Sequence, residues 1–500
     1  MILVGVLALP ALGALLLALL PAHLDRSARW VGVAVTAATF LVSLALLDGR
    51  SSGAKGDWQH VDVRWVPAID LRFHLGVDGI SLPLVVLTTL LTLLCAIYTV
   101  HSLPAPGRAG TMLALVLVLE VGMVGTFLAR DLLLFFVFFE VVLAPMYFLI
   151  AVWGGPQARH AATKFVLYTL LGSVLLLVGL LTVYAAAGTL DMVALAHAHG
   201  SGIARSTQGA AFLLLFAGLA VKSPLWPVHT WLPDAHTEAP TVGSVLLAGV
   251  LLKMGTYGLI RVALPIVPAG AERFAPLLAV LAVAGIGVGT LACFTQTDLK
   301  RLVAYSSVGH MGFVLLGIST LSEVGVQAAL FGNIAHGVIT SLLFFAVGGI
   351  KERFRTSEMA AIGGGLAKRL PRLGALLTLA AVASLGLPGL AGFWGEAFAV
   401  LAAYRPAASL DRTLYLTLAV LAAVGAALAA AYFLRMLRSV VAGPPPAAAQ
   451  HAAAVPDASP VELLAWAPLA LLGVVLGLYP ALVLDLTKPA VALLVTALPG

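Results

Sequence analysis

The sequence predicts an all-α integral membrane protein, and three observations support this fold class. Of its 500 residues, 61% are hydrophobic and only 10% are charged, whereas an ordinary soluble domain is about 45–50% apolar and about 25% charged. Apolar stretches long enough to cross about 30 Å of hydrocarbon recur along the whole chain. Runs such as Leu132 to Phe139 are apolar on every face, which favours helices over the alternating strands of a membrane barrel. A soluble fold is therefore excluded.

About fourteen membrane-spanning helices are expected from these stretches. They lie near residues 2–20, 30–48, 80–100, 111–129, 132–152, 162–187, 209–232, 241–263, 275–296, 299–319, 324–350, 371–403, 412–436 and 461–484. No basic segment precedes the first stretch, so we expect an uncleaved helix and not a signal peptide. The loops on one side then hold about 15 Lys and Arg and those on the other about 10, which places both termini outside.

Two longer connections separate these spans. Residues 49–79 form a mixed-charge extramembrane segment, and residues 437–460 run through Gly443-Pro444 into an Ala-rich stretch typical of a flexible linker. Neither is large enough to be an enzyme domain. The two cysteines, Cys95 and Cys293, lie inside apolar runs, and no spacing suited to zinc or an iron–sulfur cluster is present. The net charge of +6 comes from basic residues in loops, so we expect contact with the lipid bilayer and not with nucleic acid.

Ionisable residues inside the spans carry most of the functional information, because each costs roughly 2.5–3.5 kcal/mol at a helix centre. Four such residues stand out, and Glu120 is a fifth candidate. The four are Glu140, Lys222, Lys253 and Glu396. The alternative for any one of them is a buried ion pair that only fixes helix packing.

Two of these charges adjoin breaks in apolar spans. Lys222 is followed by Ser223-Pro224, and Glu396 is preceded by Pro388-Gly389. Both helices should therefore be discontinuous, which in a membrane requires a polar cavity inside the protein. Two interrupted spans in corresponding positions indicate an inverted-repeat transporter. Lys222 and Glu396 are 174 positions apart, and the same offset places Glu140 near His310.

Four histidines are candidate proton carriers, because imidazole titrates near neutral pH and has two ring nitrogens. His310 and His336 lie within spans, whereas His229 and His236 flank the break after Lys222. The alternatives are histidines that hydrogen-bond for packing and, for His310 and His336, haem ligation.

Several long motifs resemble NADH-quinone oxidoreductase subunit M, an antiporter-like membrane subunit of bacterial respiratory complex I. They are Asp131-Leu-Leu-Leu-Phe-Phe-Val-Phe-Phe-Glu140, Pro145-Met-Tyr-Phe-Leu149, Val221-Lys-Ser-Pro-Leu-Trp-Pro-Val-His-Thr-Trp-Leu-Pro-Asp-Ala-His236, Glu238-Ala-Pro-Thr241, Leu251-Leu-Lys-Met-Gly-Thr-Tyr-Gly258 and Asp298-Leu-Lys-Arg-Leu-Val-Ala-Tyr-Ser306. The similarity runs from about residue 80 to residue 440.

The resemblance implies fourteen helices with two inverted five-helix repeats, proton translocation, and a bacterial inner-membrane location. It implies helices 1–3 within residues 1–110, repeats at 111–263 and 275–436, and a linker with a last helix at 437–500. The implied proton-translocating residues are Glu140, Lys222, Lys253, Glu396, His310 and His336, with Glu120, His229 and His236 as possible secondary relay residues.

Several partners follow from the same resemblance. They are subunits of the L and N types, small membrane subunits, and other subunits that carry FMN, iron–sulfur clusters and quinone. No catalytic, cofactor or metal site is expected in this chain. A subunit of a multisubunit cation/proton antiporter and a structural scaffold remain alternatives.

We expect the Glu140–Lys222 pair to open and close, because an opposite charge stabilises a buried ammonium and its removal favours proton release. The proton would then pass from Lys222 to Lys253, and by way of His310 or His336 to Glu396.

Overall fold

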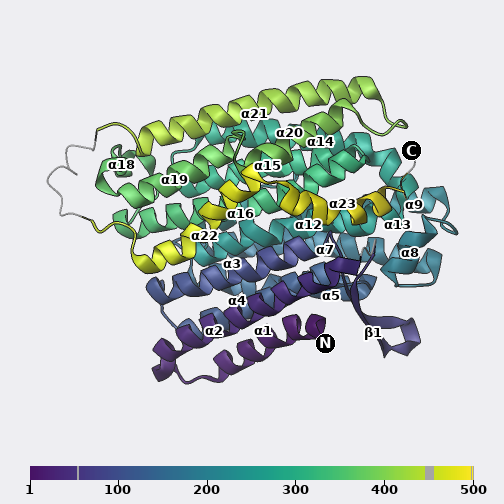
Figure 1. Cartoon of the computed structure of the whole chain (residues 1–500), viewed down its shortest axis with the longest axis horizontal. Coiled ribbons are helices and arrows are strands. Elements are labelled where there is room, and N and C mark those ends of the chain that lie inside the picture. The colour runs from purple at the N-terminus through teal and green to yellow at the C-terminus, as the bar shows by residue number, and fades with distance from the viewer. Residues whose placement is uncertain (53–55, 445–454, 497, 499–500) are drawn as a thin grey trace.

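The computed structural model describes residues 1–52, 56–444, 455–496 and 498. Long helices run side by side along the longest axis of the molecule (Figure 1). In the described residues, twelve of them are long and apolar enough to cross a membrane, which confirms a multi-pass helical architecture. Of the predicted linker at 437–460, residues 445–454 lie outside the described residues.

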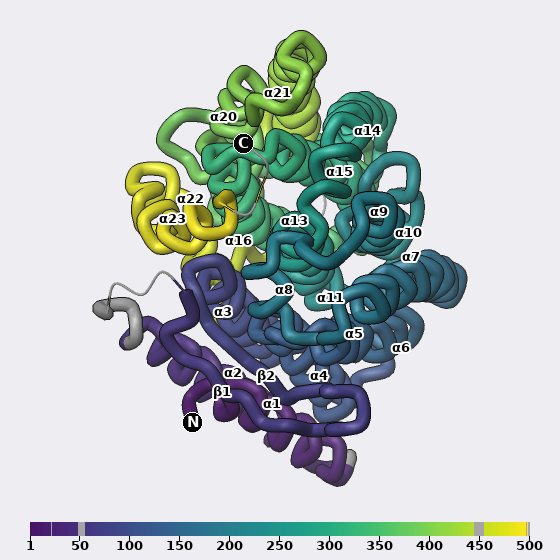
Figure 2. The backbone as a smooth tube through the Cα atoms, turned by 90° about the vertical axis from the view of Figure 1, so that its right-hand side faces the viewer, coloured from purple at the N-terminus to yellow at the C-terminus, as the bar shows by residue number. Residues whose placement is uncertain are grey.

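The N-terminal part consists of four long helices and a β-hairpin. The elements are α1 (Ile2–Leu19), η1 (Ala22–Leu24), α2 (Asp25–Leu44), η2 (Ala45–Ser52), β1 (Gln59–Val66), η3 (Pro67–Ile69), β2 (Leu71–Val77), α3 (Leu82–His101) and α4 (Ala109–Leu128). The hairpin occupies the predicted extramembrane segment, with Gln59 opposite Val77 and a register irregularity between Arg64 and Val66. It packs across the ends of α1 and α4 (Figure 2). We call this end of the molecule the hairpin end.

Two further groups of helices follow. The first comprises α5 (Leu132–Val141), α6 (Leu143–Trp153), α7 (Ala158–Ala187), α8 (Met192–Ala198), α9 (Arg205–Lys222), α10 (Trp231–Glu238), α11 (Thr241–Leu246), η4 (Leu247–Leu251), α12 (Leu252–Gly258), η5 (Leu259–Ala263) and α13 (Leu264–Ile266). The second comprises α14 (Pro268–Thr295), α15 (Leu299–Ser319), α16 (Glu323–Phe354), α17 (Met359–Ile362), α18 (Leu366–Arg369), α19 (Pro371–Ser384), α20 (Ala391–Tyr404) and α21 (Arg412–Val440).

The two predicted spans that are absent from these twelve helices are those expected to be discontinuous. The span at 209–232 is divided between α9 and α10, and the span at 371–403 between α19 and α20. Pro224 and Pro227 explain the first break because proline cannot donate a backbone hydrogen bond. Gly386 and Gly389 at the second break adopt φ of +72° and +92°, a conformation that favours glycine. The predicted number of fourteen membrane-spanning helices is not confirmed, since twelve helices of the described residues meet the length and composition for a span.

A pair of backbone bridges repeats in the two groups of helices. Asp131 pairs with Asp191, and Asp298 pairs with Glu358. Each bridge has two hydrogen bonds of 2.9 Å: Leu132 N to Leu190 O and Met192 N to Arg130 O, then Leu299 N to Ser357 O and Met359 N to Thr297 O. Each residue number in the second bridge is 167 higher than its counterpart in the first; for example, Asp298 corresponds to Asp131. This offset of 167 residues differs from the 174 that separate Lys222 and Glu396. With the offset of 167, Glu140 corresponds to Ser307, which lies one helical turn before His310.

The C-terminal part contains two helices where one was expected. α22 (Pro460–Leu478) begins with a capping box formed by Ser459 and Glu462. It ends two residues before Pro480, and α23 (Ala481–Val495) follows. α23 packs against α16. The predicted span at 461–484 is thus divided by the proline.

Candidate functional site

Lys253 lies at the centre of the molecule with a fully buried side chain. Its Nζ lies 2.6 Å from Nδ1 of His336 on α16 and also donates to the carbonyl of Ala248. The helix carrying Lys253 is flanked by the π-helical turns η4 and η5. A π turn accommodates an extra residue and is frequent at functional sites. Lys253 therefore occupies an irregular, fully enclosed helix segment with an imidazole as its side-chain partner.

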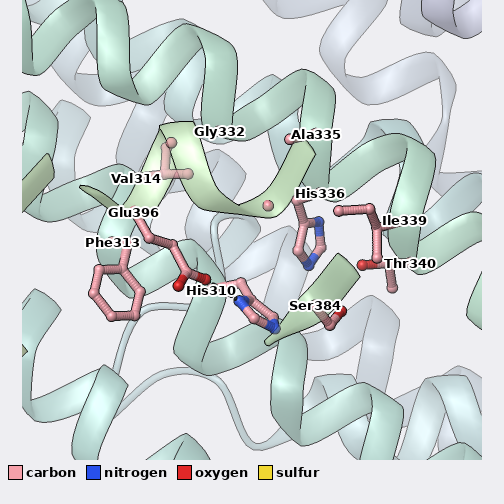
Figure 3. Close-up of a pocket in the computed structure, with 12 residues that line it drawn as sticks. His310, Phe313, Val314, Gly332, Ala335, His336, Ile339, Thr340, Ser384 and Glu396 are labelled. Atoms are coloured by element: carbon pink, nitrogen blue, oxygen red, sulfur yellow. Dashed lines mark hydrogen bonds and ion pairs between the residues drawn. The ribbon is translucent and has the colours of Figure 1, made fainter. Parts of the chain in front are cut away.

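A second histidine, His310 on α15, contacts the glutamate that follows the second helix break. Nδ1 of His310 lies 2.7 Å from Oε1 of Glu396 on α20. Figure 3 shows the His310 ring between the Glu396 carboxylate and the His336 ring. A cavity of about 30 Å³ is lined by these three side chains, Thr340 and Ser384 among others. This space is enough for a water molecule.

The two histidines connect these contacts into one series. Their ring centroids lie 5.8 Å apart, and Nε2 of each is buried without a hydrogen-bond partner. The order Lys253, His336, His310, Glu396 is called the relay series below. From the sequence, either His310 or His336 could carry a proton from Lys253 to Glu396. In the structure both histidines lie between these two residues.

The α12 face beside Lys253 carries a hydroxyl that also meets α16. Thr256 donates to Oδ1 of Asn333 at 3.0 Å, one helical turn from His336 on the same helix. Nδ2 of Asn333 and Oγ of Ser341 are buried without partners. Buried polar groups of this kind are normally satisfied by protein or by water, so the facing surfaces of α12 and α16 are suited to water.

Lys222 is the last residue of α9, at the first helix break. The Trp231 indole donates to the carbonyl of Val221 at 3.0 Å, which satisfies a group near the interrupted helix end. Nζ of Lys222 lies 4.6 Å from the centroid of the Phe139 ring. The adjacent Ser223 hydroxyl is buried without a partner and lies against Gly255 of α12, where a side chain would collide with it. The break thus closely approaches the helix that carries Lys253.

Glu140 lies near the end of α5, where the helix is interrupted at Val142. Pro145 accounts for this interruption because its ring conflicts with the carbonyl four residues earlier. This proline was not among the helix breaks predicted from the sequence. The carboxylate accepts a hydrogen bond from Ser173 of α7. In the described residues no ion pair within 4.0 Å joins Glu140 to Lys222. The expected pair is therefore open in this structure.

The secondary candidates do not hydrogen-bond to the relay series. Glu120 accepts from Thr92 at 2.6 Å, and its other oxygen has no partner. His229 packs edge-on against Tyr305. His236 stacks on Phe344 with ring centroids 4.5 Å apart, and both of its nitrogens are buried without partners.

Three polar residues at the site were missed as candidates from the sequence. Ser173 and Ser223 are single hydroxyls in apolar helices, and nothing in the sequence distinguishes them from packing residues. Lys300 lies at the edge of a predicted span, where a charge is expected to face water, but only 1% of it is exposed. Its Nζ donates to the carbonyl of Ala239 at 2.5 Å, and it lines a cavity of about 260 Å³.

One trio of side chains among the described residues has the spacing of a metal site. Donor atoms of His101, Glu352 and Glu462 lie within 4.8 Å of one another. Arg353 already donates to both Glu462 oxygens, at 2.7 and 2.8 Å. A bidentate guanidinium neutralises this carboxylate, so the trio is satisfied as an ion-pair network that joins α3, α16 and α22.

Comparisons with known proteins agree with this geometry. A family model described as "NADH:quinone oxidoreductase/Mrp antiporter, TM" matches residues 129–424. NADH-quinone oxidoreductase subunit M of Rhodobacter capsulatus is 42% identical over 481 residues, covering 94% of this chain and 91% of the relative. NAD(P)H-quinone oxidoreductase chain 4 1 of Nostoc sp. is 40% identical, covering 96% of this chain and 88% of that protein.

Solved structures extend the similarity to the whole fold. A chain of respiratory complex I from Thermus thermophilus has a TM-score of 0.87 at 30% identity, covering 100% of both chains. A chain of the Mrp complex from Dietzia sp. has a TM-score of 0.84 at 25% identity, covering 100% of this chain and 99% of that one. The chain therefore belongs to the NADH-quinone oxidoreductase subunit M family, within the wider group of NADH:quinone oxidoreductase and Mrp antiporter membrane subunits.

Proposed function

We propose that the chain translocates protons as a membrane-arm subunit of NADH:quinone oxidoreductase and carries no redox centre of its own. The observation that supports this best is the relay series, in which four ionisable side chains from four helices follow one another, two of them buried and the other two only 10% and 14% exposed. Intramembrane ionisable residues are costly and usually mark proton or ion pathways. Family membership supports the assignment to complex I.

The proton path that we propose begins at Glu140 and Lys222. The open arrangement, with Glu140 bonded to Ser173 and Lys222 over an aromatic ring, favours release of the Lys222 proton because no carboxylate is directly paired with the ammonium. Closure of the pair restores that stabilisation. The unpartnered Ser223 hydroxyl, between the break and α12, is suited to hold a water that carries the proton toward Lys253.

From Lys253 the proton passes along the relay series to Glu396. His336 receives it at Nδ1, and His310 passes it on from Nδ1 to the Glu396 carboxylate, with water between the free Nε2 atoms. Imidazole suits this role because one nitrogen accepts a proton while the other donates one. Glu120, His229 and His236 are secondary, since none of them hydrogen-bonds to the series.

The repeated backbone bridges support two inverted units, which we place at residues 111–263 and 275–436. We propose that they are preceded by a unit at 1–110 and followed by a linker and C-terminal segment at 437–500. We further propose a bacterial inner-membrane location with both termini outside, since the loops that would then face the cytoplasm hold more Lys and Arg. The chain begins at the hairpin end and α23 also lies there (Figure 1), which fits a common side. Subunits of the L and N types and small membrane subunits would adjoin the chain, while FMN, iron–sulfur clusters and quinone are held elsewhere in the complex.

Substitution at the start and in the middle of the path tests this function. Glu140→Gln and Lys253→Ala should each sharply lower NADH-driven proton pumping and coupled quinone reduction in membranes that retain an assembled complex. Glu323→Gln and Lys368→Ala, which change exposed residues of the same types, are the matched controls. Normal pumping in the first two variants would contradict the proposal. A stand-alone antiporter subunit would instead give Na⁺-dependent transport and co-purify without quinone reductase subunits.

A further inference from the structure

A largely buried charge cluster lies at the hairpin end, one helical turn beyond Lys253 by way of Tyr257. It consists of Asp57, Asp78, Arg130 and Arg261, and we call it the hairpin-end cluster. Arg130 is only 1% exposed and pairs with Asp57 at 2.6 Å and with Asp78 at 3.6 Å. Arg261 pairs with Asp78 at 2.6 Å. The four side chains form one continuous network of alternating charge.

Tyr257 connects this cluster to the helix of Lys253. The two residues are one turn apart on α12, so they lie on the same face. The Tyr257 hydroxyl donates to the carbonyl of Phe127 at 2.7 Å. Its oxygen accepts from Arg130 Nη1 at 3.4 Å and from Arg261 Nε at 3.3 Å. The hydroxyl proton is thus held by the Phe127 carbonyl, and both guanidinium groups donate to the hydroxyl oxygen.

A cavity lies on the outer side of the cluster. It measures about 160 Å³ and is lined by all four cluster residues together with His197 and His199. This volume is enough for several waters. The cluster and Tyr257 therefore separate a space suited to water from the segment that holds Lys253.

None of the groups in this separating layer can pass a proton inward. A guanidinium does not deprotonate in proteins, and each of its N–H groups is a donor only. The Tyr257 oxygen, which would have to accept a proton, already faces two such donors. Burial alone would raise the pKa of Asp78, but Arg261 and Arg130 lower it well below its ordinary value, so this carboxylate stays ionised and paired.

The second repeated unit lacks this arginine. Arg130 contributes its carbonyl to the first backbone bridge, and the corresponding residue of the second bridge is Thr297. A bridge of the same geometry thus forms without a charge at this position. The architecture of the unit does not by itself require Arg130.

We infer that the hairpin-end cluster is an electrostatic barrier that prevents Lys253 from exchanging protons with water at the hairpin end. The cluster is neutral overall, so the barrier comes from the two guanidinium groups that face the Tyr257 oxygen and from the lack of a free proton acceptor. An arginine that lines a membrane channel excludes protons in a similar way. The inference rests on the proposed function of Lys253. It adds that the only productive outlet from Lys253 is the imidazole of His336, so that a proton cannot return to water before it reaches Glu396.

Passive proton leak through the whole complex tests this inference. The complex carrying Arg130→Gln is reconstituted into vesicles loaded with a pH-sensitive dye, and an external pH step is applied without NADH or quinone. The dye should respond severalfold faster than with the unchanged complex, while NADH:quinone reductase activity remains. Arg261→Gln, which removes the other donor to Tyr257, should have the same effect. Arg72→Gln breaks an exposed ion pair with Asp62 on the same hairpin and should cause no leak.

The double variant Arg130→Gln/Lys253→Met identifies the route of the leak. Its leak should return to the level of the unchanged complex, because the internal acceptor is gone. An assembled Arg130→Gln or Arg261→Gln complex that remains proton-tight overturns the inference, and so does a leak that persists without Lys253. Failure of the proposed function has a different signature, namely full pumping by Lys253→Met alone.

Discussion

Nζ of Lys253 lies 2.6 Å from Nδ1 of His336, a residue 83 positions later in the chain. The contact joins an irregular helix segment in the first group of helices to a long helix in the second. The lysine meets an imidazole here instead of a carboxylate, and an imidazole can exchange a proton with an ammonium. A permanent ion pair would hold the proton in place. This contact therefore suits the proton transfer that we propose.

His310 and Glu396 should behave as one functional unit. Because their 2.7 Å contact forms a single step, His310→Gln or Glu396→Gln alone should lower pumping by about 100-fold, as loss of a positioned proton-transfer group commonly does. The double variant should lose little more, since members of a unit are not additive. The measurement is the initial rate of NADH-driven acidification in inverted vesicles, and multiplicative losses would show that the two residues act separately.

Ser173 should control how readily Glu140 pairs with Lys222. Ser173→Ala removes the hydroxyl that holds the carboxylate in the open arrangement. A hydrogen bond to a charged group contributes about 1.5–3 kcal/mol. Its loss should therefore shift the equilibrium about tenfold or more toward the closed Glu140–Lys222 pair. Turnover should slow while the complex assembles normally. Thr182→Ala, an exposed hydroxyl on the same helix, is the control, and equal rates in both variants would refute this role.

Arg353 and Glu462 should matter for stability. Glu462 is fully buried and bonded to Arg353 through both oxygens, and removal of one partner leaves an uncompensated charge. Arg353→Gln should therefore lower stability by about 3–5 kcal/mol. Glu462→Gln should be milder because it leaves no buried carboxylate. Thermal unfolding of the solubilised complex measures both, and the reverse order would contradict this explanation.

The hairpin should loosen on acidification through His74. Burial lowers the pKa of His74 from its ordinary 6.5, although Asp191 opposes this. The unfolded segment then binds a proton more readily than the folded one, so stability is full above pH 6.5 and falls as the pH drops toward the folded pKa. The protection factors of the β2 amides, which correct hydrogen exchange for its intrinsic pH dependence, should fall below pH 6.5 in the native protein and not in His74→Gln. The same fall in both would assign it to other groups.

The sequence predicted the helical membrane fold and both broken helices, because composition and the positions of proline and glycine determine them locally. It did not predict the β1–β2 hairpin, although Val61, Val63 and Trp65 alternate with polar residues as strands do. It missed α23 as well, since Pro480 was read as part of one longer span. At the site it identified every member of the relay series, because charged residues in apolar helices are conspicuous.

What the sequence could not supply was the order of contacts. The packing of α12, α15, α16 and α20 determines that His336 contacts Lys253 and that His310 contacts Glu396. The open Glu140–Lys222 pair depends on Ser173, whose hydroxyl resembles those that merely cap a helical carbonyl. The burial of Lys300 follows from its packing against Ala239. Each of these is a tertiary relationship with no local signal.

The central claim, that protons pass from Lys253 through His336, is tested most directly by the ratio of protons pumped per NADH oxidised in the assembled His336→Met complex. The relay series predicts that pumping falls as far as in Lys253→Ala, and that combining the two substitutions lowers it no further. An unchanged ratio in His336→Met, with electron transfer at its normal rate, would contradict the account.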